Sequence, residues 1–83
     1  MNHHTSPSFW ATFEELPTEI QALARANYEL LRENPRHPSL HFKKVGENWS
    51  VRVGLGYRAL GTDVEDGVLW AWIGTHAEYN KLI

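Results

Sequence analysis

The spacing of apolar side chains predicts two helices in the first half of the chain. Ser6 followed by Pro7 is typical of a helix start, because serine caps free backbone N–H groups and proline suits the first helical position. Apolar residues then recur at helical spacing at Phe9, Trp10, Phe13 and Leu16. Pro17 disfavours helical geometry at the residue before it and can itself open a second helix.

The second predicted helix has one apolar side. That side is formed by Ile20, Leu23, Ala24, Leu30 and Leu31. The helix is expected to stop at Asn34, because Pro35 and Pro38 make a stiff connector that no helix can continue through. Two helices joined this closely predict an αα-hairpin.

Beyond this connector the apolar residues no longer recur about every 3.6 positions but at every second position, which indicates strands. The predicted strands are residues 40–45, 49–53, 57–60 and 68–73. We expect a loop at residues 63–67, and the continuous apolar run that follows suits a central strand buried on both faces. Thr75 and Glu78 have the spacing of a capping box, which predicts a short terminal helix.

The order of these elements predicts one α+β domain over residues 1–83. An N-terminal αα-hairpin is followed by an antiparallel sheet of three to four strands and a short C-terminal helix. Residues 1–7 are expected to be a flexible N-terminus.

Composition then restricts the chemistry. The chain has no cysteine, which excludes disulfides and thiol catalysis, and its five histidines lack a recognised metal-ligand spacing. We therefore expect neither a metal nor another cofactor. No apolar run approaches the roughly 20 residues that span a bilayer, and the first residues lack the regions of a signal peptide, so we expect a cytoplasmic protein that binds no membrane. A net charge of −2 argues against binding nucleic acid through overall charge, but local basic patches remain open.

Several short segments occur together in an order that resembles a known family. They are Phe9-Trp10, Leu16-Pro17, Asn34-Pro35, His37-Pro38-Ser39-Leu40, Phe42-Lys43-Lys44, the stretch Trp49 to Val53, Tyr57-Arg58 and the stretch Ile73 to Tyr79. Together they resemble the RelE/ParE superfamily of type II toxin–antitoxin toxins, in particular a compact subgroup that ends in an IGTHxEY pattern. The resemblance covers nearly the whole chain from Phe9 onward.

The resemblance implies a helical hairpin packed on a twisted antiparallel sheet, and a bacterial toxin that is held by a cognate antitoxin protein. In many members the concave face of the sheet acts as an endoribonuclease that cleaves mRNA on the ribosome, an mRNA interferase that blocks translation. ParE-like members use the same fold to poison DNA gyrase without RNA chemistry. A relative that binds an antitoxin without being toxic is a third alternative, because fold does not decide activity.

Metal-free RNA cleavage needs a base for the 2′-hydroxyl, an acid for the leaving oxygen and cations for the phosphate. Arg52 has the opposite strand parity to Val51 and Val53, so its side chain should leave the core face. By resemblance, Arg52 and Arg58 fall where RelE-like toxins carry phosphate-contacting lysines and arginines, and a guanidinium fork suits that task. The alternative is a pair of solvated or salt-bridged surface arginines.

The C-terminal GTH motif supplies a proton-transfer group. If Thr75 caps the last helix, His76 lies in its first turn, where free N–H groups favour an anion. By resemblance, a histidine at this position serves as acid or base in several nuclease members; packing on Trp72 is the alternative. Tyr79 lies on the same helical face as His76 and could stack on a base or donate its hydroxyl, or instead belong to the core or a partner surface.

One segment is locally basic. It carries Lys43 and Lys44, with His41 close by. These three residues are predicted to follow an RNA backbone. The alternative is a charged sheet edge that discourages aggregation.

Overall fold

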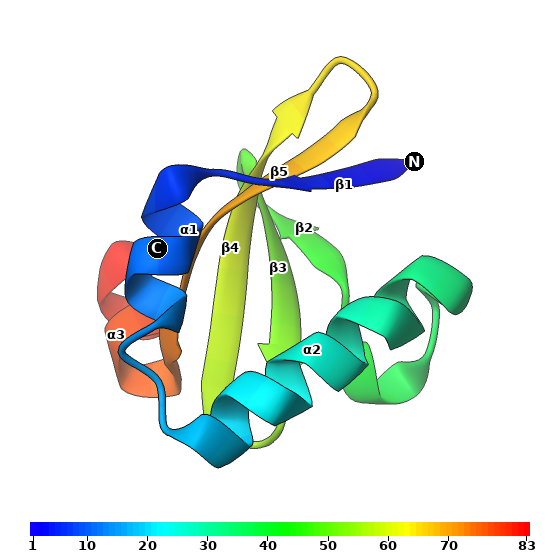
Figure 1. Ribbon diagram of the computed structural model, residues 1–83. Coiled ribbons are helices and arrows are strands. Elements are labelled where there is room, and N and C mark those ends of the chain that lie inside the picture. The colour runs from blue at the N-terminus through cyan, green and yellow to red at the C-terminus, as the bar shows by residue number, and fades with distance from the viewer.

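A computed structural model describes all residues, 1–83, and gathers the strands into one five-stranded sheet (Figure 1). The elements are β1 (Asn2–Thr5), α1 (Pro7–Phe13), α2 (Thr18–Glu33), the 3₁₀ helix η1 (Pro38–Leu40), β2 (Lys43–Val45), β3 (Asn48–Val53), β4 (Tyr57–Val64), β5 (Gly67–Thr75) and α3 (His76–Leu82). The sheet order is β1-β5-β4-β3-β2, in which β2 to β5 form an antiparallel meander and β1 adds parallel to β5. The predicted α+β class is confirmed.

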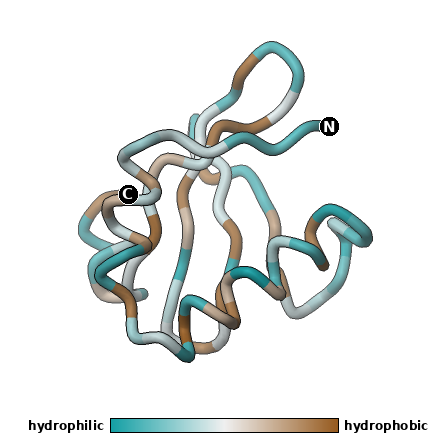
Figure 2. Tube along the Cα trace, in the orientation of Figure 1, coloured by the Kyte–Doolittle hydropathy of each residue, from teal (hydrophilic) through white to brown (hydrophobic).

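The helices begin and end close to where the local signals predict. The Ser6 side chain accepts a hydrogen bond from the Phe9 N–H and caps α1, with Pro7 at the first turn. The link of residues 14–17 is held by Gln21, whose side-chain amide donates to the carbonyl groups of Phe13, Glu14 and Leu16. Figure 2 shows hydrophobic and hydrophilic residues mixed along α2, as a helix with one buried side requires. None of the helices is long and apolar enough to cross a membrane.

The N-terminal segment is a strand, which differs from the flexible terminus expected for residues 1–7. Its backbone pairs with β5, and polar side chains fix that pairing. The Asn2 side chain donates to the Asp66 carboxylate (3.0 Å), and the indole N–H of Trp70 donates to Nδ1 of His3 (3.1 Å). The pairing depends on polar groups that meet only in the folded chain. The segment therefore lacks the apolar alternation from which a strand could be predicted. It also raises the strand count above the predicted three to four.

Two strand boundaries differ from the prediction. Leu40 belongs to η1 rather than to a strand, so β2 is confined to Lys43–Val45. The loop expected at residues 63–67 is a tight hairpin turn at residues 65 and 66, because β4 and β5 pair as far as Val64 and Gly67. This turn lies at the tip of the β4–β5 hairpin, which projects from the body of the molecule (Figure 1).

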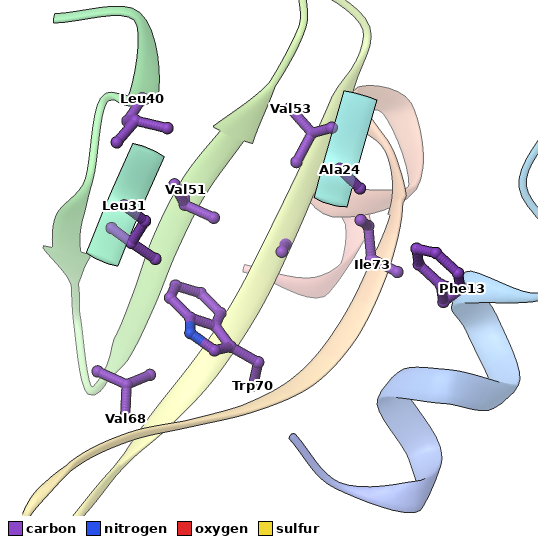
Figure 3. Packing of buried hydrophobic residues seen from close by; sticks show 10 residues of the cluster. Phe13, Ala24, Leu31, Leu40, Val51, Val53, Val68, Trp70 and Ile73 are labelled. Carbon is purple, nitrogen blue, oxygen red and sulfur yellow. The ribbon is translucent and has the colours of Figure 1, made fainter. Parts of the chain in front are cut away.

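The core lies between the sheet and the pair α1 and α2. Figure 3 shows the labelled members of its cluster, with Trp70 among aliphatic side chains. The cluster consists of Phe13, Ala24, Leu31, Leu40, Val51, Val53, Ala59, Val68, Trp70 and Ile73. In Figure 1 these two helices lie nearer to the viewer than the sheet, whereas α3 lies farther away. The opposite face of the sheet is therefore covered only in part, next to α3.

Candidate functional site

The sheet face that points away from α1 and α2 is built from rows of directly opposed residues. Val51 and Val53 are buried in the core, so the alternation of a strand turns Ser50 and Arg52 to the opposite face. One row consists of Arg52, Arg58 and Gly74, and the next consists of Lys43, Ser50, Leu60 and Trp72. We call the first the arginine row and this surface the open face.

The arginine row opposes two like charges, and the Glu78 carboxylate, next to Gly74 at the end of the row, forms an ion pair with neither of them. Arg52 and Arg58 are cross-strand partners, an arrangement that normally destabilises a sheet. The ion pairs of the molecule involve other residues, and neither arginine takes part in one. Of the alternatives for these two residues, a salt bridge finds no partner in the structure, whereas two solvated surface arginines remain the alternative to a phosphate site. Two like charges held side by side lower the stability of the fold. Such an arrangement is typical of sites that bind anions.

Two polar atoms on the open face are buried without a hydrogen-bond partner. They are Nε of Arg52 and Oγ of Ser50, and the Ser50 residue has no exposed surface. Buried polar groups are nearly always paired, so each such atom calls for an explanation. Both lie on neighbouring positions of the same strand face. Ser50 was not among the residues selected from the sequence, although it shares strand parity with Arg52.

α3 joins the arginine row through Tyr79. The Arg58 guanidinium carbon lies 5.5 Å from the centre of the Tyr79 ring, which is a cation–π distance. The His76 ring also stacks on the Tyr79 ring, with centroids 6.0 Å apart and planes at 21°. Tyr79 is only 5% exposed, so its ring acts as a platform that sets Arg58 and His76 in place.

The start of α3 is fixed by the predicted capping box. The Thr75 hydroxyl accepts a hydrogen bond from the Glu78 N–H (3.1 Å), and the Glu78 carboxylate accepts one from the Thr75 N–H (3.0 Å). These bonds, first from the Thr75 N–H and then from its hydroxyl, lower the pKa of the Glu78 carboxyl. The His76 N–H donates to the Gly56 carbonyl (2.8 Å), which ties the helix start to the β3–β4 turn.

Removal of this cap should therefore loosen the helix that carries His76. Thr75→Ala should destabilise the protein by about 1 kcal/mol, the usual cost of losing an N-cap side chain. In a domain of this size that lowers the melting temperature by about 4–8 °C. Thermal unfolding followed by circular dichroism measures the shift. Thr75→Ser keeps a capping hydroxyl and should melt close to the parent; equal losses for both variants would show that the cap is not the cause.

His41 stands at the β2 end of the arginine row. Its pKa is lowered, first by the charge of Arg52, then by burial and by the charges of Arg58 and Lys43. Its backbone is left-handed, with φ of 45°. Lys43 is exposed and lies opposite Ser50 on the open face. His41, Lys43 and the two arginines are therefore brought together.

Lys44 is not part of this group. It lies opposite Trp49 and so faces the other side of the sheet. Its ammonium group pairs with the Asp63 carboxylate and lies 5.5 Å from the centre of the Trp49 ring. Hydrogen bonds from Lys44 and then Trp49 lower the pKa of Asp63. The strand alternation thus separates Lys44 from Lys43, and the structure does not bring it to the predicted RNA-binding set.

The net charge of −2 does not reveal this local excess of cations. Half of the ten acidic residues lie in one stretch that contains the link and α2, on the other side of the sheet. They are Glu14, Glu15, Glu19, Glu29 and Glu33. A slightly acidic protein can therefore present a cationic open face. No group of three or more histidine, aspartate or glutamate side chains is placed to hold a metal ion.

Solved structures with this fold include a RelE toxin and two antitoxin–toxin complexes. A chain of the RelB–RelE antitoxin–toxin complex from Methanococcus jannaschii matches with a TM-score of 0.72 at 15% identity, covering 96% of this chain and 98% of that one. YafQ from E. coli matches with a TM-score of 0.69 at 13% identity, over 94% and 96% of the two chains. The toxin–antitoxin complex RelBE2 from Mycobacterium tuberculosis matches with a TM-score of 0.61 at 20% identity, over 90% and 96%. At these identities the likeness shows the fold.

Sequence comparison identifies the family. No curated protein sequence matches the chain significantly. The model of the ParE-like toxin domain matches residues 18–81, which is well over half of the chain and spans α2, the meander and most of α3. The protein therefore belongs to the ParE-like toxin domain family within the RelE/ParE superfamily of toxins.

Proposed function

We propose that this protein is the toxin of a toxin–antitoxin pair and that it blocks translation by cleaving RNA on the open face. The observation that carries the proposal is the row of directly opposed arginines, neither of which takes part in an ion pair. A phosphodiester carries a negative charge and several acceptor oxygens, so it would neutralise the opposed cations and accept hydrogen bonds from their guanidinium N–H groups.

The chemistry follows from this phosphate position. Arg52 and Arg58 would hold the non-bridging oxygens and stabilise the charge that develops on them in the transition state. The 2′-oxygen loses its proton to a base and bonds to phosphorus, while the bond from phosphorus to the 5′-oxygen breaks. His76 would give its proton to that leaving oxygen. The products would be a 2′,3′-cyclic phosphate and a 5′-hydroxyl end.

An antitoxin protein is the expected partner. Two of the structures with the same fold are described as antitoxin–toxin complexes. The open face could be blocked by an acidic segment, and apolar surface such as that around Trp10, which is 39% exposed, could bind a helix or strand. An antitoxin would in this way keep the toxin inactive in the cytoplasm.

A second candidate function follows from the family. Because the matching family is described as ParE-like, the chain could inhibit a protein target such as DNA gyrase without any catalysis. In that case the arginine row would contact acidic groups of the target protein. The two functions differ in which cellular process stops first.

Induction in a bacterial host distinguishes the two functions. We expect incorporation of labelled amino acids into protein to stop within minutes, before DNA synthesis falls, and Arg52→Ala to relieve the effect. Arg36→Ala removes an exposed arginine of the connector after α2, which is not part of the arginine row, and should remain as toxic as the parent. If instead DNA synthesis stops first and broken or relaxed DNA accumulates while protein synthesis continues, the gyrase alternative is correct. A harmless parent protein would reject both activities.

A further inference from the structure

We infer that His41 is the general base of the proposed reaction and removes the proton of the 2′-hydroxyl next to the phosphate at the arginine row. The inference rests on the proposed function and adds to it a group from the connector before β2. His76 and His41 then act from the two ends of the row.

The neighbours of His41 along the chain fix its direction. Leu40 is completely buried in the core, and Phe42 stacks on Trp49 with centroids 4.8 Å apart, on the helix side of the sheet. Between these anchors the His41 side chain is exposed to solvent, and it lies in the field of Arg52, Arg58 and Lys43, which all belong to the open face. Both anchors hold the backbone from one side, so the position of His41 is set before any ligand binds.

The start of β2 places His41 next to the arginine row. Lys43, the first residue of β2, lies opposite Ser50 in the antiparallel ladder, and His41 precedes it by two residues, towards the end of β3 that carries Arg52. Neighbouring strands are about 4.8 Å apart, so Arg52 and Gly74 are separated by roughly 10 Å across the sheet, and His41 lies beyond Arg52. His76 follows two residues after Gly74. In-line displacement at phosphorus needs its base and acid on opposite sides, which matches this separation.

The backbone at His41 is left-handed. It is the one residue other than glycine with a positive φ, a conformation that costs an ordinary residue about 1–2 kcal/mol. A residue keeps a strained backbone conformation where the surrounding structure forces it to, and such residues cluster at functional sites. Here the buried Leu40 on one side and β2 on the other impose the turn.

The charges around His41 suit a base. The groups that act on it are Arg52 of β3, Arg58 of β4 and Lys43 of β2, all of them cations; they lower its pKa, with the charge of Arg52 as the largest cause and some loss of solvation as a smaller one. A lowered pKa keeps the imidazole neutral through the neutral pH range, and only the neutral ring can accept a proton. A bound phosphate would offset the arginine charges and so raise the proton affinity of His41 when substrate arrives.

Each proton and bond in the step is accounted for. A ring nitrogen of His41 takes the 2′-hydroxyl proton as the 2′-oxygen bonds to phosphorus. The phosphorus–5′-oxygen bond breaks, and the 5′-oxygen takes a proton from the His76 imidazolium. Lys43 carries an ammonium group, which has no lone pair to accept a proton. Tyr79 is buried beneath Arg58 and stacks on His76 at the other end of the row, so His41 is the acceptor at the β2 end.

The test compares purified parent protein with His41→Asn, because asparagine also tolerates left-handed backbone. Substrates are a short RNA and an mRNA bound to bacterial ribosomes, at single turnover between pH 5 and 9. We expect His41→Asn to cleave about 10²-fold more slowly or worse, and to lose the fall in rate that the parent shows as acid protonates His41. Binding of a 2′-deoxy analogue should change less than about threefold, and added imidazole should restore part of the rate. His4→Asn, in β1, is the matched control and should behave as the parent.

The outcomes separate this inference from the proposed function. If the parent cleaves RNA and His41→Asn does so at the same rate with the acid limb intact, His41 is not the base, while the arginine row remains the site. If His41→Asn is slow only because it no longer binds the 2′-deoxy analogue, His41 is a binding residue and the inference is wrong. If the parent neither cleaves nor binds RNA with or without ribosomes, the proposed function itself fails and the inference fails with it.

Discussion

Replacement of Arg58 by alanine is expected to reduce RNA cleavage by about 10²- to 10³-fold, the usual loss when one preorganised donor to a developing oxyanion is removed. The protein should remain folded, because the change removes one of two opposed like charges and leaves the core untouched. Arg58→Lys keeps the charge but loses the two-pronged guanidinium and its stacking on Tyr79, so it should fall between parent and alanine variant.

Single-turnover cleavage and growth after induction both measure this effect. Circular dichroism and thermal unfolding confirm that each variant is folded, and Arg36→Ala controls for the loss of one positive charge elsewhere. A folded Arg58→Ala protein that retains full cleavage would show that the arginine row does not hold the reacting phosphate. A variant that melts far below the parent would show instead that Arg58 serves stability.

Leu40→Ala is expected to have the largest effect on stability. The side chain has no exposed surface and belongs to the core cluster (Figure 3), so its truncation leaves a cavity and should cost about 2–5 kcal/mol. A domain of this length has about 4–12 kcal/mol in total, at roughly 0.05–0.15 kcal/mol per residue. The variant should therefore lie at or near the edge of folding at 37 °C.

Urea unfolding followed by tryptophan fluorescence measures this loss. Leu55→Ala provides a control of identical chemistry, because Leu55 is 94% exposed in the β3–β4 turn. It should change the free energy of unfolding by less than about 0.5 kcal/mol. Similar midpoints for the two variants would contradict the position of Leu40 in the core and, with it, the anchoring of His41.

The elements that could be predicted from sequence are those fixed by local signals. Ser6 and Thr75 cap helices through side chains within three residues, and the apolar alternation of β3 identifies the face that carries Arg52. These features depend on neighbours along the chain. The capping box in particular required nothing beyond the pair Thr75 and Glu78.

The features that escaped prediction depend on pairing between distant strands. β1 exists because its polar residues meet Asp66 and Trp70 of the β4–β5 hairpin, more than sixty positions away. Lys44 could be separated from Lys43 only once the register of β2 was known. The opposed arginines and the unpartnered Ser50 hydroxyl likewise follow from register, which the sequence alone leaves undetermined.

The apparent conflict between net charge and RNA binding is resolved by the distribution of charge. Acidic residues concentrate in α2 and its preceding link, while Arg52, Arg58 and Lys43 share the open face. Attraction to an RNA backbone acts over about a Debye length, roughly 8 Å at physiological salt, so the nearby cations dominate at this surface. Binding should accordingly weaken as salt is added.

The most direct test of this account is to locate bound RNA on the protein. We would titrate the ¹⁵N-labelled protein with a short RNA whose 2′-hydroxyl at the scissile position is replaced by hydrogen, and record amide chemical shifts by NMR. The account predicts changes at Ser50, Arg52, Arg58 and the start of α3, and at His41, with α1 and α2 little affected. Changes confined to the helices, or no saturable change at all, would contradict the assignment of the open face as an RNA-cleaving site.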